Sequence, residues 1–537
     1  SATNAYFMAD TVDYIESVLT GSEFWEFGHL FWRPLGRVTF LLFEPVTSRM
    51  VGADPETNVL VIFMAYNWIA GLASVLLIYK LARLLSESRP AAILVTVAFS
   101  LSHGFLNFAQ TGSSYIPGLA SLLLGLFLLV KAAKSDPGNR WLAIGGGVAL
   151  ACAVCFWFLY IWAVPAALAA PLVLSGLDYD RRKLATRAAL ACAVAIGLSY
   201  SVVLIHLGIY TPTDLRAWVA ASSHGITELR GVTRVAFGVP RSLVHMGDDA
   251  TLFKRFLLND SLNPVSALDL LRLSLWKLAF FYLFVAALVI NLSRSTEGKR
   301  ALALLGLAAA PLIGFAIFFD GASVERYLPL YPLLFLSLAV SLAAPRSLKS
   351  LKLTTVAFVI VMALTSVLAM SKPALASQEQ AISSRIAGLA PLLRPASLLV
   401  TMTQQDELVN FQRAALFNPI ILDLDLNVYT VIELGSKYET SWREMFAAKA
   451  LDVWDRGGDV WVSKRLFTSR PRAEWAWVEA ENARVSWTDV QSFFAGKETG
   501  QELGGADGFM LLLPTPINRQ SLEAVKRPAV EEARAGR

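Results

Sequence analysis

Long apolar runs separated by short polar connections dominate this sequence. Each run holds about twenty residues, the length that an α-helix needs to cross a hydrocarbon core of roughly 30 Å. The runs lie at 59–79, 91–108, 114–133, 141–158, 159–176, 187–209, 272–292, 300–319, 327–345 and 354–371. The pattern therefore predicts an all-α polytopic membrane protein with about ten spans in this chain.

Lysine and arginine cluster in the connections that follow the odd-numbered runs. They are Lys80, Arg83 and Arg89; Lys131, Lys134 and Arg140; Arg181, Arg182, Lys183 and Arg187; Arg294, Lys299 and Arg300; and Arg346, Lys349 and Lys352. Short basic connections stay on the cytoplasmic side of a membrane. The first 50 residues, the connection at 210–271 and the region after 376 are therefore expected on the outer side.

Three regions follow from this topology. Residues 1–50 form an outer first loop, residues 51–376 form a transmembrane helical domain, and residues 377–537 have a more charged composition. That last region holds β-rich runs at 397–402, 419–424, 459–463 and 508–513 and an amphipathic helix at 442–454. It is therefore expected to be an extracytoplasmic α/β domain. No basic and apolar leader stands before Asp10. Either one more helix precedes Ser1 as an eleventh span, which we favour, or residues 1–40 lie on the membrane surface as amphipathic turns.

Composition supports the membrane class and excludes others. The chain has 537 residues, of which 55% are hydrophobic and 17% charged, and its mean hydropathy of +0.52 is too high for a soluble globular protein. The net charge of +5 comes from connections between apolar runs, so no nucleic-acid partner is expected. All three cysteines lie in apolar runs, which argues against a disulfide framework.

The polar stretch before the first run carries two aspartates, Asp10 and Asp13. A carboxylate at a membrane surface can act as a general base toward an acceptor hydroxyl, or it can hold a divalent cation such as Mg²⁺ or Mn²⁺. A spacing of three puts both on one side of a helix. The alternative is a solvated loop whose acids only aid solubility.

The same stretch offers further candidate substrate contacts, namely Tyr14, Trp25, Glu26, His29 and Trp32. Next to them, Arg33 presents a planar fork that suits a phosphate group. The alternative is an interfacial belt, because arginine and tryptophan are common at this depth in membrane proteins.

Other candidates lie on the outer side by the same topology. Glu325, Arg326 and Tyr327 stand where the ninth run begins and form either an anchor or a site for an anionic headgroup. The outer connection is basic, with His224, Arg230, Arg234, Arg241, His245, Lys254 and Arg255, and could cover a polyprenyl phosphate or simply contact lipid. His103 falls near the same side. No ligand spacing supports a metal site among the histidines, so a metal remains unknown.

These elements together resemble the GT-C membrane glycosyltransferases, in particular the protein O-mannosyltransferase-like and aminoarabinose-transferase-like branches. The resemblance rests on Asp10-x-x-Asp13-Tyr14, on Phe31-Trp32-Arg33-Pro34-Leu35 and on Glu325-Arg326-Tyr327-Leu328, in that order and on one predicted face. The sequence departs from those branches because its two acids are not adjacent, so either Asp10 or Asp13 could be the catalytic one. It also lacks a TPR array and a Trp-Trp-Asp-Tyr-Gly element.

The resemblance implies an inverting hexosyl or pentosyl transfer from a polyprenyl-phosphate donor to a hydroxyl of a protein, lipid or glycan. It implies Asp10 or Asp13 as the base, with Arg33, Arg326 and Tyr327 toward the donor phosphate. A bacterial cytoplasmic membrane with a periplasmic site is the expected setting, and no cofactor is certain. The rival predictions are a glycan or lipid transporter or flippase, and a structural subunit of glycan assembly.

Overall fold

The computed structural model describes most of the chain in two compact units. The described residues are 9–21, 24–51, 55–134, 139–175, 179–222, 232–246, 256, 265–319, 321, 323–344, 349–371, 390–401, 427–430, 442–467, 487–503 and 508–535. The first unit comprises residues 1–250 and 271–371, and the second comprises 251–270 and 372–537. The predicted boundaries at 50 and 376 stay predictions.

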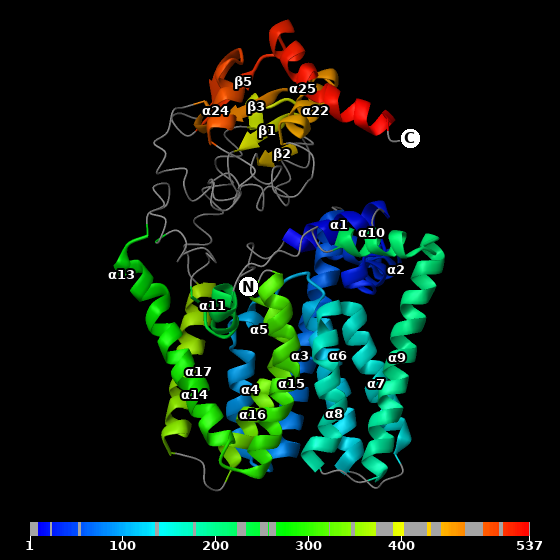
Figure 1. Ribbon diagram of the computed structural model, residues 1–537, viewed down its shortest axis with the longest axis vertical. Helices are drawn as coiled ribbons and strands as arrows, with labels where there is room; N and C mark the ends of the chain where they lie inside the picture. The colour runs from blue at the N-terminus through cyan, green and yellow to red at the C-terminus, as the bar shows by residue number, and fades with distance from the viewer. Residues whose placement is uncertain are drawn as a thin grey trace. The chain divides into compact units, whose positions relative to one another are not determined.

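The first unit is a bundle of helices (Figure 1). Its α-helices are α1 (Ala9–Thr20), α2 (Trp32–Val51), α3 (Pro55–Ser86), α4 (Arg89–Ser100), α5 (His103–Phe108), α6 (Tyr115–Lys134), α7 (Arg140–Phe156), α8 (Val164–Ser175), α9 (Tyr179–Leu207), α10 (Pro212–Ser222), α11 (Val232–Leu243), α14 (Trp276–Leu292), α15 (Thr296–Phe318), α16 (Tyr331–Ala343) and α17 (Lys349–Ser371). Short 3₁₀ turns are η2 (Phe27–His29), η3 (Phe158–Trp162) and η5 (Glu325–Leu330). Helix α13 (Ala267–Leu270) and a π turn, η4 (Leu271–Leu275), lead into α14.

The all-α membrane class is confirmed. Among the described residues, seven helices are long and apolar enough to cross a membrane, and three further apolar helices are shorter. Together they coincide with the ten predicted runs, but the run 91–108 is not one helix. It breaks at Leu101, where the backbone leaves the helical region, and the Ser102 hydroxyl donates to Phe99 O at 2.6 Å. The short helix α5 that follows is therefore not part of a continuous span.

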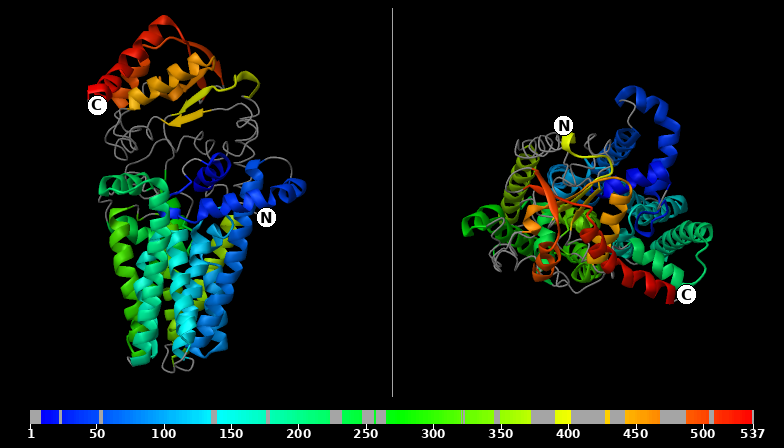
Figure 2. Two further views of the ribbon diagram at one scale, coloured as in Figure 1. Left: turned by 90° about the vertical axis from the view of Figure 1, so that its right-hand side faces the viewer. Right: turned by 90° about the horizontal axis from the view of Figure 1, so that it is seen from above.

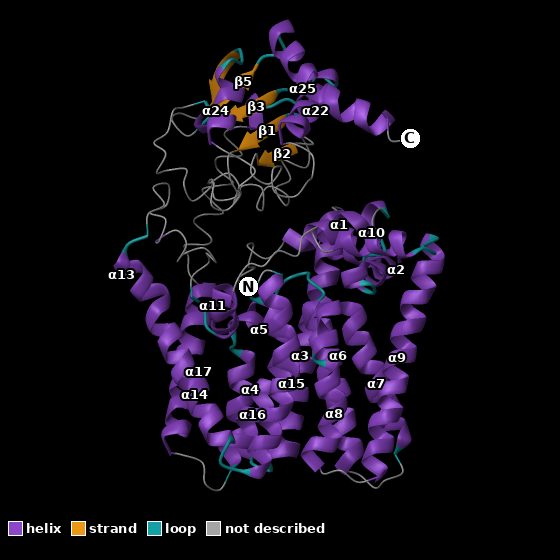
Figure 3. Ribbon diagram, in the orientation of Figure 1, coloured by secondary structure: helices purple, strands orange, loops and turns teal. Residues whose placement is uncertain are grey.

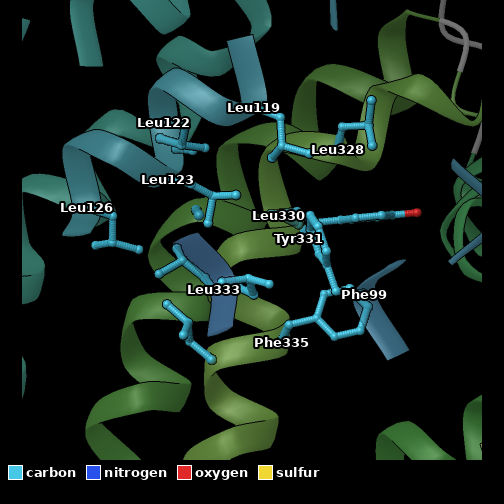
Figure 4. Close-up of a cluster of buried hydrophobic side chains, with 14 of the residues drawn as sticks. Phe99, Leu119, Leu122, Leu123, Leu126, Leu328, Leu330, Tyr331, Leu333 and Phe335 are labelled. Atoms are coloured by element: carbon cyan, nitrogen blue, oxygen red, sulfur yellow. The ribbon is translucent and has the colours of Figure 1, made fainter. Parts of the chain in front are cut away.

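Small residues and leucines hold the bundle together. A Cβ on Gly147 of α7 would lie 2.2 Å from the carbonyl oxygen of Ala188 in α9, so these helices pack backbone to backbone. The leucines of α6 interdigitate with η5, α16 and Phe99 of α4, as Figure 4 shows.

The two ends of the bundle differ in chemistry. The last turns of α3, α6, α8, α14 and α16, each of which precedes a basic connection in the sequence, lie at one end (Figure 1). Helices α1, α2, α5, α10 and α11 lie at the other, which we call the α1 end. The arrangement of the helices thus has the alternation that the charge pattern predicts.

The predicted first loop is largely helical. Helix α1 packs against α2 and α3, and α2 reaches outward from the bundle (Figure 2). Five apolar side chains of α2 are more than half exposed, namely Val38, Leu41, Leu42, Phe43 and Val46. Exposed apolar side chains on a helix beside a membrane bundle are typical of a helix that lies in the lipid interface.

The second unit contains a five-stranded mixed sheet with helices, which confirms the α/β character of the tail (Figure 3). The strands are β1 (Leu398–Thr401), β2 (Asn427–Thr430), β3 (Val460–Ser463), β4 (Thr499–Leu503) and β5 (Phe509–Leu512), in the order β2-β1-β3-β5-β4. Strand β1 is parallel to β2 and β3, whereas β5 is antiparallel to β3 and β4. The helices are α22 (Trp442–Asp455), α24 (Trp487–Ala495) and α25 (Pro516–Ala535). The predicted strand at 419–424 lies outside the described residues.

Candidate functional site at the α1 end

Helix α1 carries both predicted catalytic aspartates. Asp10 and Asp13 lie in its first turns, and their side chains are outside the described part of the structure. On the same helix, Thr11, Tyr14 and Ser17 are buried. Because a helix turns once in 3.6 residues, position 10 falls on the stripe between Tyr14 and Ser17, whereas position 13 falls outside that stripe.

Close contacts fix α1 on the bundle. A Cβ on Gly112 would lie 2.3 Å from Thr11 Cγ2, so α1 rests directly on the backbone between α5 and α6. At the other end, Arg37 Nη1 donates to Val18 O at 2.7 Å and to Leu19 O at 3.3 Å. This guanidinium also complements the negative end of the helix dipole. Helix α1 is therefore held at both ends.

His29 connects the first loop to the spans. Its Nδ1 lies 2.6 Å from Ser114 Oγ and 3.2 Å from Phe156 O. A carbonyl oxygen only accepts hydrogen bonds, so the contact with Phe156 needs the proton on Nδ1. The imidazole also meets the Tyr14 ring edge to face, with ring centroids 5.5 Å apart.

Arg33 is held by a carboxylate and an aromatic ring. Its Nη2 lies 3.0 Å from Glu26 Oε2, and the side chains are only 6% and 15% exposed. The guanidinium carbon stands 5.4 Å from the centre of the Tyr14 ring. The neighbouring Trp32 donates its indole proton to Gly112 O at 2.9 Å. The structure thus brings together five of the predicted site residues, Tyr14, Glu26, His29, Trp32 and Arg33, which we call the α1 cluster.

The predicted residues of η5 have partners of their own. Arg326 stacks on Phe319, with its guanidinium carbon 4.4 Å from the ring centre, and its Nε lies 3.9 Å from Glu325 Oε1. The buried Tyr327 donates its hydroxyl proton to Gly321 O at 2.6 Å. Tyr327 therefore packs η5 against the segment that precedes it.

A second group of basic residues gathers where α5, α11 and α14 meet. The ring centroids of His103 and His245 are 4.8 Å apart, and Lys277 Nζ donates to His245 O at 2.8 Å. His103 is 5% exposed and Lys277 8%. Arg241 acts on the same histidine. We call His103, Arg241, His245 and Lys277 the basic cluster.

The electrostatics of the basic cluster favour an anion. Burial lowers the pKa of His103 well below its ordinary value, and the nearby charges of His245, Arg241 and Lys277 lower it further. All the charges that act on His103 in the described part of the chain are thus basic. Its buried Nδ1 also has no hydrogen-bond partner among the described residues. A phosphate oxygen at this place would supply both the missing partner and the negative charge.

One segment, His103–Tyr115, links the two groups. His103 belongs to the basic cluster at its start, while Gly112 and Ser114 near its end contact the α1 cluster. The segment is fixed from a third side, because Asn67 Nδ2 donates to Ser113 O at 2.8 Å. The segment therefore forms a rigid surface, which we call the site floor, for a ligand that reaches both groups.

The remaining predicted contacts are placed differently. Trp25 lies away from the α1 cluster and lines an open cavity of about 530 Å³ with Phe24, Arg37, His206 and Trp218. His224 and Arg230 lie outside the described residues. Sequence reasoning noted Arg241 and His245 only as part of a basic loop and missed Lys277. The available signal was a lysine inside the apolar run 272–292, since a charge within a span is rarely incidental.

Comparisons with known proteins found similar solved structures at low sequence identity. No family model and no curated protein matches the sequence. Among solved structures, the chain is similar to ArnT from Cupriavidus metallidurans bound to undecaprenyl phosphate, with a TM-score of 0.49, 10% identity, and coverage of 94% of this chain and 92% of that one. The apo state of the same protein gives a TM-score of 0.47 at 10% identity, covering 84% and 87%.

The Archaeoglobus fulgidus oligosaccharyltransferase in complex with Zn and sulfate is also similar, with a TM-score of 0.42, 13% identity, and coverage of 95% of this chain and 70% of that one. Both proteins are GT-C glycosyltransferases, the group that the sequence motifs resemble. TM-scores below 0.5 define no residue-by-residue equivalence. The roles of individual residues therefore have to come from the geometry of this chain.

Proposed function

We propose that the protein is a membrane glycosyltransferase that moves a sugar from a polyprenyl-phosphate carrier to a hydroxyl of an acceptor glycan, lipid or protein. One observation carries the proposal: the segment His103–Tyr115 borders a buried basic cluster at one end and an aspartate-bearing helix at the other. Cations that hold a phosphate leaving group and a carboxylate that activates a hydroxyl are the two requirements of such a transfer.

Asp10 is the general base in this proposal. Its position on α1 lies on the buried stripe with Tyr14 and Ser17, whereas Asp13 lies beside that stripe. The carboxylate takes the proton of the acceptor hydroxyl, and the oxygen attacks the anomeric carbon. The bond from that carbon to the phosphate oxygen breaks on the opposite face, so the configuration inverts and the lipid phosphate leaves.

The basic cluster holds the phosphate. His103 and Lys277 are buried, so their interaction with the negative charge that develops on the leaving group is little screened by water. Arg326, which stacks on Phe319, is the second candidate for this role. Arg33 already binds the Glu26 carboxylate, so we assign it to positioning of the α1 cluster.

Asparagine variants of the two aspartates test the catalytic assignment. With labelled polyprenyl-phosphate sugar and isolated membranes, Asp10→Asn is expected to lower transfer by about 10²–10⁴-fold, the usual contribution of a general base. Asp13→Asn is expected to lose less transfer activity. Full activity in both variants would exclude this mechanism.

The predicted divalent cation is tested separately, by measuring transfer in EDTA and again after Mg²⁺ or Mn²⁺ is added back.

A variant of the basic cluster tests the phosphate assignment separately. Lys277→Met should raise the KM for the lipid-phosphate donor, and Lys299→Met at the opposite end of the bundle is the control. If Lys277→Met and the unaltered protein have equal KM values, Arg326 becomes the residue to which phosphate binding is assigned.

Transport is the rival function. Purified protein that moved the lipid across liposomes without forming a glycosidic bond would favour it.

The proposed setting is a bacterial cytoplasmic membrane with the α1 end on the periplasmic side. The apolar helices establish an integral membrane protein. The helix ends that precede the basic connections lie at the other end of the bundle and support the orientation, because such connections stay in the cytoplasm.

A further inference from the structure

An open cavity of about 530 Å³ lies at the α1 end, outside both clusters described above. Four parts of the fold line it: Gly21, Phe24 and Trp25 after α1, Arg37 of α2, the end of α9, and helix α10. Its volume is within the range of roughly 300–1,000 Å³ typical of small-molecule sites. The proposed reaction assigns it no role.

Aromatic side chains form the walls of this cavity. The Trp25 ring packs edge to face against His206, with centroids 6.0 Å apart, and against Phe24, with centroids 5.1 Å apart. Trp218 of α10 donates its indole proton to Trp25 O at 2.9 Å, which fixes one wall to the other. Rigid aromatic faces beside open water suit a ligand with one apolar and one polar aspect, as a sugar ring has.

One cation lines the cavity. Arg37 uses Nη1 to cap α1, and among the described residues it forms no ion pair. A guanidinium can bind a carboxylate or phosphate group with two parallel hydrogen bonds. The cavity therefore combines sugar-binding walls with an anion-binding group.

The cavity and the basic cluster lie on opposite sides of the α1 end. In Figure 1, α9 and α10 stand on one side, while α5 and α11 stand on the other. Arg37 binds the last turn of α1, and Asp10 lies in its first turn. The rise of an α-helix puts these two places about 12–14 Å apart. A ligand in the cavity thus lies beyond the reacting atoms and far from the proposed donor phosphate.

We propose that this cavity binds a negatively charged saccharide unit of the acceptor, such as a uronic acid or a phosphorylated sugar. Its place in the acceptor, rather than the donor, rests on the proposed transferase function. The separation from Asp10 implies that the acceptor is an extended glycan whose charged unit is recognised at a distance from the hydroxyl that reacts.

A glycan array probes the cavity without requiring catalysis. Full-length protein in nanodiscs of neutral lipid is applied to uronic-acid glycans, phosphorylated glycans and neutral glycans. We expect binding to the charged glycans, and a loss of roughly tenfold or more in Arg37→Gln, which removes a charge-assisted bidentate contact. His206→Ala should weaken binding without changing the preference for charge.

Matched variants separate the possible outcomes. Arg216→Gln removes an exposed arginine of α10 that does not line the cavity, and it should bind as the unaltered protein does. Arg37→Lys keeps the cap on α1 and shows whether a loss in Arg37→Gln reflects misfolding. Absence of glycan binding, equal binding in Arg37→Gln, or binding only when anionic lipid headgroups are added would overturn the proposal.

Asp10→Asn distinguishes this proposal from the proposed function. If that variant is inactive and still binds charged glycans, both stand. If Asp10→Asn is inactive and neither it nor the unaltered protein binds any glycan on the array, the cavity assignment is wrong and the proposed transferase function is retained. If it remains active while the array is positive, the cavity binds saccharide and the catalytic proposal is wrong.

Discussion

Glu26 and Arg33 show what a single pair contributes at the α1 end. They join η2 to the start of α2, and their side chains are nearly buried, at 15% and 6% exposure. A buried ion pair adds little over a well-packed apolar pair, but loss of one partner removes charge compensation from the other in a medium that solvates it poorly. The pair therefore matters most when it is broken.

Glu26→Gln is accordingly expected to destabilise the protein by about 3–5 kcal/mol. The measurement is thermal or denaturant unfolding in detergent. Lys134 and Glu87 provide the matched control, because that pair is 37% and 85% exposed and Glu87→Gln should change stability by less than about 1 kcal/mol. The double variant Glu26→Gln with Arg33→Met should recover much of the loss, and a double variant as unstable as the single one would refute this account.

At the residue scale, the sequence predicted which residues of the first loop come together but not which residues elsewhere in the chain they contact. The motifs around Tyr14, His29 and Arg33 named five residues that the fold brings together. Their partners could not be predicted, because His29 meets Ser114 and Phe156, far away in the chain, only once α6 and α7 have packed. The neighbours of Lys277 could not be predicted for the same reason, since they come from α5 and from α11 and the residues after it.

At the element scale, hydropathy located the spans and missed how some of them begin. Apolar character is nearly uniform through 91–108, so the pattern does not show the break at Leu101 that frees His103–Tyr115 to form the site floor. Helices α1 and α2 were expected as loop because their apolar positions are fewer than those of a span. Tertiary contacts at Gly36 and Gly112 explain why they pack as helices.

Gly112→Ala tests the contact between α1 and this floor. The new Cβ would lie 2.3 Å from Thr11 Cγ2, so α1 must shift, and transfer activity is expected to fall far more than stability does. Gly306→Ala on α15 is the control, because no atom lies within 4 Å of its Cβ position. Helix propensity predicts a stabilisation of up to about 1 kcal/mol there. Unchanged activity in Gly112→Ala would show that α1 need not be held at this point.

For the whole molecule, orientation is the main prediction. In a background with the three cysteines replaced by alanine, Tyr210→Cys at the α1 end should react with an impermeant maleimide on intact spheroplasts. Ser350→Cys lies beside a basic connection and should react only after permeabilisation. Both positions are exposed in the structure. The reverse labelling pattern would place the α1 end in the cytoplasm.

The exposed apolar side chains of α2 couple the chemistry to the bilayer itself. Helix α2 packs against α1, since a Cβ on Gly36 would lie 3.0 Å from Val18 Cγ2. The depth of α2 in the lipid interface therefore also sets the depth of Asp10 relative to the membrane. A change in acyl-chain length moves the lipid interface relative to the spans at a modest cost in free energy. Transfer rates in vesicles of graded thickness should therefore peak at one chain length and fall on either side, which makes membrane thickness a control on the reaction.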